Sequence, residues 1–583
     1  MTSDEVPLMF QAQVEGRCQI QRVIPKEQRQ QSHDWVDQWL KVCPAKIPPS
    51  SAPSQPVKTK PGQSVSTALM RPQNKALMRP QPQKEAKDAA EQIPKFGPGV
   101  KTKDYEISWR FVSNSGQDEG VIRPAIAAKG WPFYPGASMK GAFLRACDNE
   151  QQAKRYCGEK QCDRTTTPGI LRFHGAYPVN TDWTKQLVDI IHSQQERQVI
   201  KEQVTRANAQ ISLYQPTLRF GISSSKKLEE SEWKTIWRIW EKALAQGLGS
   251  RVSAGYGQFK LARDNQLLQV KLKGQGVAST LIDTTPEFRP NMFKAALRGH
   301  TLRLLGGFTD EATAQQLTKE LWGGFAGSNG SVVGLLGVAF DYKAADLKPG
   351  VHDYKAMPVY ELQSGVLSIL CMHRNLPLKQ RQELETLAES LIKFSMLLGG
   401  FGKSWRRVDH RLFFPSYLAS KSKPMIGCHW EFLADSQSFY YPVNDLKDIR
   451  TFLTSLNNVI KSWVTPRAKL ASQGAKNWRE AWHKAQVWGR IAANSQDSHA
   501  VKWFHDNYSG SESIKATILT GQISQIGHIW HRMYPRYSPE EKGGIKSTNE
   551  YVELLTIFPD PSTSTQKFIK FLERESEFVK LWG

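Results

Sequence analysis

The sequence lacks a long hydrophobic run and has few cysteines, and each deficit excludes a class of protein. None of its runs approaches 18 apolar residues, so we expect no transmembrane helix. The first 20 residues contain Asp4, Glu5 and Glu15 and no apolar segment of the kind that a signal peptide needs. Seven cysteines scattered over 583 residues favour a reducing compartment over a disulfide framework. We therefore expect a cytoplasmic protein without a membrane anchor.

Acidic residues are also in deficit relative to basic ones. The chain has 55 Asp and Glu against 78 Lys and Arg, which gives a net charge of +23. Hydrophobic residues make up 39%, enough to bury sizeable cores, so a wholly disordered chain is excluded. This charge favours a polyanionic partner. RNA, DNA and an anionic membrane surface all satisfy it, and charge alone does not choose among them.

Residues 44–100 contain very few large apolar side chains that could form a hydrophobic core. They hold 11 prolines, nine Lys or Arg and a single aromatic residue, Phe96. We predict a disordered, Pro-rich basic linker over residues 44–103, which serves either as a solvated spacer or as a strap that adds phosphate contacts. Before it, alternation from Leu8 to Val14 predicts one strand. Residues 1–43 are too short to fold alone, and we expect them to dock on the first domain.

From residue 104 onwards the spacing of apolar residues is that of a folded domain that contains both strands and helices. It predicts a strand over residues 105–112, a helix after the turn 135–141, and a strand over 169–173. Apolar residues between Trp233 and Leu244 recur at helical spacing. That helix is followed by a glycine-rich loop, residues 247–257.

The next segment repeats these elements in the same order. A helix begins near Pro290 and ends at Gly306, a strand covers 334–340, and a second helix covers 384–398 before another glycine-rich loop, 399–407.

The spacing within the two copies is also nearly equal. From Lys140 to Gly247 is 107 positions, and from Lys294 to Gly399 is 105. Equal order and spacing predict tandem copies of one α+β domain, over residues 104–275 and 276–411. Residues 412–583 are predicted to form a helical C-terminal region. Its tryptophans are expected mainly in the core; they are Trp463, Trp478, Trp482, Trp488, Trp503 and Trp530.

The turn 135–141 is the first candidate binding site. Its sequence is Pro-Gly-Ala-Ser-Met-Lys-Gly, and Ser138 is a plausible N-cap for the helix that follows. A helix N-terminus favours an anion, whereas Lys140 in the first turn opposes the helix dipole. A bound phosphate would resolve that conflict, with Arg145 one turn further on. The alternative is an ordinary turn with exposed basic residues.

The two glycine-rich loops are the second candidate. The first interleaves glycines with Arg251, Ser253 and Tyr256, a combination that suits a sugar–phosphate track with occasional stacking. The second loop carries an equivalent set, Lys403, Trp405, Arg406 and Arg407. The alternative for each loop is a β-turn with surface arginines.

The sequence gives weaker evidence for a nucleotide-binding loop, a zinc site or a nuclease site. A P-loop at Gly402-Lys403-Ser404 would need glycine at Leu397, and the segment follows a helix instead of a strand. Cys147, Cys157, Cys162 and His174 have loose spacing for zinc, so free buried thiols are the favoured interpretation. Asp118 is a candidate nuclease residue, although a solvated loop residue is the simpler interpretation. We expect no cofactor, no bound metal and no catalytic residue.

These motifs resemble the RAMP (repeat-associated mysterious protein) superfamily of CRISPR–Cas systems. Residues 135–141 match its turn, and residues 169–178 and 247–259 look like the sixth subunit of the Cmr-type (type III-B) effector complex. Residues 289–298 and 399–407 are similar to the first subunit of that complex, although Ala295 and Gly299 depart from its pattern. The resemblance implies two ferredoxin-like, RRM-like domains in one fused chain.

The resemblance also implies a function. It suggests a non-catalytic subunit that grips the 3′ region of the guide RNA and the guide–target RNA duplex, together with other Cas subunits, in antiviral defence. The implied RNA contacts are Ser138, Lys140, Arg145, Arg251, Ser253, Tyr256, Lys294, Arg298, Lys403, Trp405, Arg406 and Arg407. The alternative is a RAMP-family endoribonuclease that cleaves target RNA or CRISPR repeat RNA. A ribonucleoprotein unrelated to CRISPR also remains open.

Overall fold

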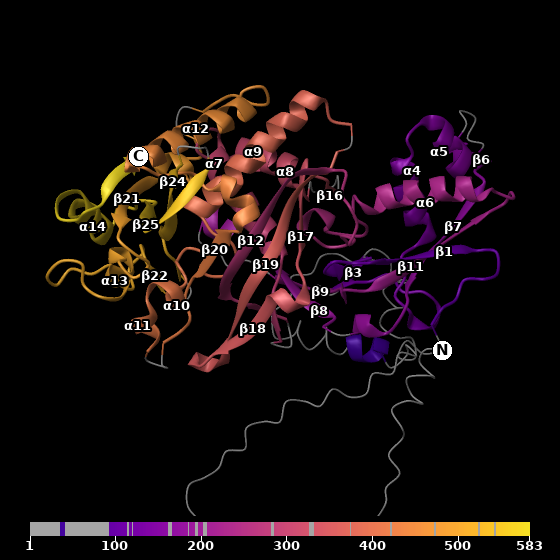
Figure 1. The fold of residues 1–583 in the computed structure, drawn as a ribbon, viewed down its shortest axis with the longest axis horizontal. Coiled ribbons are helices and arrows are strands. Elements are labelled where there is room, and N and C mark those ends of the chain that lie inside the picture. The colour runs from indigo at the N-terminus through magenta and orange to yellow at the C-terminus, as the bar shows by residue number, and fades with distance from the viewer. Residues whose placement is uncertain are drawn as a thin grey trace, which may run out of the picture.

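The computed structural model describes residues 35–40 and 93–583, except for the short segments 114–115, 119–120, 161–165, 185, 193–195, 202–206, 282–284, 326–330, 374, 420–422, 472–473, 523–524 and 541–543. The described residues combine helices with small sheets, in agreement with the expected α+β class. Figure 1 shows three parts along the long axis: a first unit (93–262) at one end, a second unit (264–432) in the middle, and a C-terminal region (433–583) at the other end.

The first unit is built on a three-stranded antiparallel sheet. Its order is β1–β11–β7, with β1 at Lys101–Glu106, β11 at Thr217–Ser224 and β7 at Leu171–Pro178. Helices α4 (Gly136–Ala146) and α6 (Glu230–Leu244) pack together over one face. Residues 258–260 extend the sheet beyond β1, because the Lys260 amide donates to the Glu106 carbonyl.

Smaller elements complete the first unit. The expected strand over 105–112 is divided between β1 and β2, with residues 107–109 between them. The other elements are β2 (Arg110–Phe111), β3 (Gly116–Asp118), β4 (Val121–Arg123), α5 (Glu150–Cys157), β5 (Gly158–Lys160), β6 (Thr166–Pro168), β8 (Val188–His192), β9 (Ala207–Ile211) and β10 (Leu213–Tyr214).

The second unit has a larger antiparallel sheet in the order β17–β19–β12–β20, and its long central strand β12 (Gln266–Val277) runs across the boundary expected between residues 275 and 276. Strand β20 (Cys428–Phe432) follows the boundary expected at 411. Helices α7 (Asn291–Leu305) and α9 (Leu378–Leu397) confirm the two predicted helices. The remaining elements are β13 (Ser279–Thr280), β14 (Pro286–Glu287), α8 (Glu311–Trp322), β15 (Gly324–Phe325), β16 (Ser331–Val332), β17 (Leu336–Asp341), β18 (Leu347–His352), β19 (Met357–Cys371), α10 (His410–Phe413) and α11 (Pro415–Leu418).

The C-terminal region is not wholly helical, so that prediction was wrong. It contains a four-stranded sheet in the order β24–β25–β21–β26. Trp488 lies in β21 and Trp530 in β24, where β-branched and aromatic neighbours favour a strand. The region comprises α12 (Leu446–Val464), β21 (Gln486–Ala492), α13 (His499–His505), β22 (Gly521–Gln522), β23 (Gln525–Ile526), β24 (Ile529–Pro539), β25 (Ile545–Ile557), α14 (Thr563–Arg574) and β26 (Val579–Trp582).

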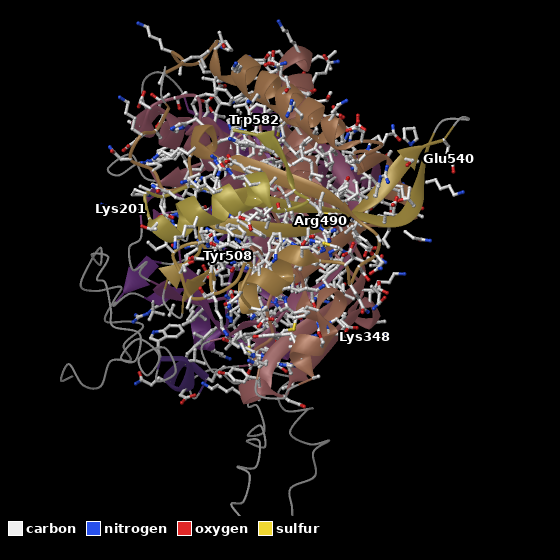
Figure 2. All side chains as sticks on the ribbon, turned by 90° about the vertical axis from the view of Figure 1, so that its left-hand side faces the viewer. Lys201, Lys348, Arg490, Tyr508, Glu540 and Trp582 are labelled. Atoms are coloured by element: carbon white, nitrogen blue, oxygen red, sulfur yellow. The ribbon has the colours of Figure 1, made fainter. Side chains whose placement is uncertain are left out.

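The tryptophans of this region are core residues, as predicted. Trp463, Trp478, Trp482, Trp488 and Trp530 are all buried, and Trp503 is partly buried. Figure 2 looks onto this end of the molecule, with Arg490, Tyr508 and Trp582 within the face and Glu540 at its margin.

Buried ion pairs join the parts to one another. Arg110 of the first unit donates to Glu287 of the second over 2.8 Å, with both side chains almost inaccessible. Arg263 pairs with Asp341 across the same junction. The amide of Glu480, in the C-terminal region, donates to the carbonyl of Val199 in the first unit. Direct contacts therefore join the first unit to the second unit and to the C-terminal region.

The described part of the N-terminal segment, residues 35–40, is a helical turn packed on the first unit. The indole Nε1 of Trp39 donates to the Gly130 carbonyl over 2.7 Å, and its ring lies 5.2 Å from that of Trp183. The last part of the predicted linker, residues 93–103, is ordered on the first unit, which corrects the prediction of disorder there: Phe96 lies against Tyr177, and β1 begins at Lys101. The strand predicted over 8–14 and residues 44–92 of the linker lie outside the described residues. Among the helices described, none is long and apolar enough to cross a membrane.

Candidate nucleic-acid interface

The turn that precedes α4 is held by close backbone packing. A Cβ atom at Gly136 would lie 2.1 Å from the carbonyl oxygen of Phe173 in β7, so this position requires glycine. The N-cap residue is Pro135, which corrects the prediction that Ser138 caps the helix. The helix begins earlier because the Met139 amide donates to the Pro135 carbonyl. Ser138 therefore lies inside the first turn.

Helix α4 presents its polar side to solvent. Met139 and Phe143 are buried against the sheet, whereas Ser138, Lys140 and Arg145 are exposed. Burial raises the pKa of Tyr134 to about 12, and the nearby Arg145 opposes that rise. These three predicted residues thus share one accessible helix.

The first glycine-rich loop is fixed in an unusual backbone conformation. Gly257 has φ +61°, and a Cβ there would lie 1.8 Å from the Leu248 carbonyl oxygen. Arg251 also adopts a left-handed conformation, with φ 60°, and its side chain is exposed. Tyr256 is buried, with its ring 4.6 Å from that of Trp109. Tyr256 is therefore a core residue and is not placed to stack on a base.

The first loop meets the start of helix α7 at the junction of the two units. The Nζ of Lys294 donates to the Oγ of Ser253 over 2.5 Å. Burial, and then repulsion by Arg298 and Arg251, lowers the pKa of Lys294 to about 7. Within the part of the chain that the structure describes, no ion pair joins Arg251, Lys294 or Arg298 to a carboxylate, and no carboxylate is among the causes that shift the pKa of Lys294 or Arg298. We call these three residues the junction cluster.

Two members of the predicted set, Arg298 and Lys403, also have structural roles. Arg298 donates to the carbonyls of Gly323, over 2.6 Å, and Thr318, so it caps the C-terminal end of α8. Lys403 is exposed in the second loop, where its backbone bridges Val277.

The structure does not bring the rest of the second loop to the surface. Trp405 is buried, with its ring 5.0 Å from that of Trp530. Arg407 donates to the carbonyls of Ile529 and Thr520 in the C-terminal region. The expectation that Trp405, Arg406 and Arg407 face RNA is therefore corrected, because these side chains form the interface with the C-terminal region.

Arg406 joins a buried cluster of arginines around one carboxylate. Its Nη2 lies 2.9 Å from Oε1 of Glu480, and Nη2 of Arg303 lies 2.7 Å from Oε2. Burial would raise the pKa of Glu480, but Arg406, Arg303 and Arg479 together lower it. The carboxylate of Glu480 is thus ionised and neutralises part of this charge. Sequence reasoning missed it, since Glu480 lies 74 residues beyond Arg406.

The remaining candidates that the structure describes, Cys147, Cys157 and His174, do not come together in one metal site. A side-chain hydrogen bond with Cys147, and then burial, raises the pKa of Cys157, so these two thiols lie together. His174 instead bonds Ser223, over 2.8 Å. Cys162 and the side chain of Asp118 lie outside the described residues, and no metal-binding group of three His, Cys, Asp or Glu occurs among those described.

No family model matches the chain, and no curated protein matches it. Among solved structures, the chain is similar to Cmr1 from Pyrococcus furiosus in its apo form, with 12% identity and a TM-score of 0.30. That match covers 54% of this chain and 98% of Cmr1. At this TM-score no residue role or activity is transferred from Cmr1.

Proposed function

We propose that this chain is a non-catalytic RNA-binding subunit of a type III CRISPR effector complex. The junction cluster carries the proposal, because three basic side chains from two units lie close enough for Arg251 and Arg298 to repel the charged form of Lys294. Like charges repel, and a phosphate between them would relieve the repulsion. The excess charge of +23 supports a polyanionic ligand.

The sheet topology supports the RAMP resemblance. The sheet of the second unit has five strands, of which β18 pairs with β19 outside the main order; the other four, numbered along the chain, lie in the order 4-1-3-2, read from β20 through β12 and β19 to β17. This is the order of a ferredoxin-like domain. In the first unit, residues 258–260, β1, β11 and β7 follow the same order. In this proposal both units bind the same guide RNA. The first unit contacts phosphates through Lys140 and Arg145 of α4 and Arg251 of its glycine-rich loop, and the second unit does so through Lys403.

The first test removes two exposed cations from the first unit. We expect Lys140→Ala combined with Arg251→Ala to weaken binding of single-stranded guide RNA roughly tenfold or more. The slope of log affinity against log salt should become shallower by about 1.4. Each phosphate contact on a single strand contributes about 0.7 to that slope through counterion release, and two contacts are lost. Filter binding across a salt series measures both quantities.

The matched control is Lys234→Ala combined with Lys379→Ala. Both residues are exposed on helices, α6 and α9, away from the junction cluster, and their loss changes the net charge equally. Equal weakening by the two double variants would show that only net charge matters and would contradict the proposal.

The second test uses the pH dependence of Lys294. Because its pKa is lowered to about 7, its ammonium group loses its proton as the pH rises through neutrality. A neighbouring phosphate favours the charged form, so RNA binding should take up a proton above pH 7. We expect the affinity to fall between pH 6.5 and 8.5, by at most about tenfold per pH unit for one proton.

The conservative variant separates this effect from others. Lys294→Arg keeps its charge over the whole range, so its affinity should change less with pH. Identical pH profiles for the wild type and Lys294→Arg would exclude Lys294 from the phosphate site.

A further inference from the structure

The sheet of the first unit has one open face. Tyr105 and Phe220 point towards the helices and are buried. Asp104 and Arg219 project to the other side, where their side chains are 40% and 46% exposed. Helices α4 and α6 therefore cover one face and leave the opposite face available for a ligand.

Two glycines leave the backbone of this open face bare, and we call the position that they mark the glycine site. Gly175 and Gly221 pair directly across β7 and β11. A Cβ atom at Gly221 would lie 2.8 Å from the ring of Phe96, so that ring rests on the bare backbone. Any larger side chain at Gly221 would prevent a flat ring from lying there.

Aromatic and polar side chains surround the glycine site. The ring of Phe96 lies 5.9 Å from that of Tyr177 and 6.2 Å from that of His174. The ring of Phe133 lies 5.1 Å from Tyr177. His174 shares a hydrogen bond with Ser223, and Arg219 makes a bidentate pair with Asp104. Proteins use this combination of stacking surfaces and hydrogen-bonding edges to recognise unstacked nucleobases.

The segment that carries Phe96 is held weakly. Within the described residues 94–100, the backbone hydrogen bond is a local one, which the Val100 amide donates to the Gly97 carbonyl. Pairing with β11 begins at Lys101. Ring contacts therefore hold Phe96 in place, and a stacking ligand could replace them.

We propose that the glycine site binds an unstacked nucleobase of single-stranded RNA and that Phe96 occupies the site until RNA displaces it. The inference rests on the proposed function. The glycine site adjoins the start of α4, because a Cβ atom at Gly175 would lie 2.9 Å from the ring of Phe133 and 3.0 Å from the amide nitrogen of Gly136, the first residue of that helix. A strand with its phosphates on α4 would thus have a base within reach of Tyr177.

The test measures both affinity and position on the RNA. A single-stranded oligonucleotide containing 4-thiouridine is bound to the full chain and photo-crosslinked, and the crosslinked peptides are identified. With the wild type we expect crosslinks at Tyr177 or Phe133. Phe96→Ala should bind about three- to tenfold more tightly, because the internal competitor is gone. Gly221→Val and Tyr177→Ala should lose these crosslinks and weaken binding at least about fivefold.

Two controls make the result decisive. Gly97→Ala introduces a Cβ into open space beside Phe96 and should behave as the wild type. An unfolding temperature of Gly221→Val close to that of the wild type would show that its loss of binding does not come from loss of the fold. If Phe96→Ala, Gly221→Val and Tyr177→Ala all bind and crosslink as the wild type while the Lys140 and Arg251 variant binds weakly, this inference fails and the proposed function stands. If none of these variants changes binding, both fail.

Discussion

Glu480→Ala is expected to destabilise the protein by about 3–5 kcal/mol, which is the usual cost of removing one partner from a buried ion cluster. The side chain of Glu480 is fully buried among Arg303, Arg406 and Arg479. Removing the carboxylate leaves three guanidinium groups close together in a low-dielectric environment. Because Arg406 comes from the second unit, the interface with the C-terminal region should loosen first.

Urea unfolding followed by tryptophan fluorescence measures this effect. Trp405 and Trp530 lie beside the cluster and report on it directly, since the guanidinium groups of Arg303 and Arg406 stack on their rings. Glu480→Gln retains hydrogen-bond acceptors without the charge and should fall between the wild type and Glu480→Ala.

An exposed ion pair provides the control. Glu230 lies 3.0 Å from Lys101, with side chains 76% and 51% exposed. Glu230→Ala should cost at most about 1 kcal/mol, because water screens such pairs. Similar losses for Glu480→Ala and Glu230→Ala would show that the buried cluster does not hold the C-terminal region.

Gly257→Ala is expected to distort the first glycine-rich loop and to cost about 3 kcal/mol or more. A left-handed conformation costs an alanine about 1–2 kcal/mol. In addition, the new Cβ would lie 1.8 Å from the Leu248 carbonyl oxygen, so the backbone must move. That movement would displace Ser253 from Lys294 and should weaken RNA binding along with stability.

Gly255→Ala in the same loop separates strain from collision. Gly255 has φ +88°, but a Cβ there would meet only the Val338 carbonyl oxygen, at 3.6 Å. This variant should cost only about 1–2 kcal/mol and should keep its RNA affinity. Urea unfolding and filter binding of the two variants test the difference. If they lose equal stability, the close approach at Gly257 has no energetic role.

Local patterns in the sequence predicted the elements that carry a strong period. Trp233, Trp237 and Trp240 fall on one helical face, and α6 forms there with these residues buried. Helices α7 and α9 are likewise evident from apolar spacing, because helical periodicity depends on neighbouring residues alone. Strands β21 and β24 of the C-terminal region are not evident from the sequence, because successive residues in each are buried and the alternating period of a half-exposed strand is absent. Trp488 and Trp530 lie in strands.

The sequence by itself determined that this chain has two successive units with similar turns and glycine-rich loops, and a large positive charge. Only the tertiary structure decided which of the basic residues face solvent. Arg251 and Arg406 occupy comparable loops, yet Arg251 is exposed and Arg406 binds Glu480 from a distant part of the chain. Exposure depends on what packs against a loop. That partner comes from residues far away in the sequence, so no local pattern records it.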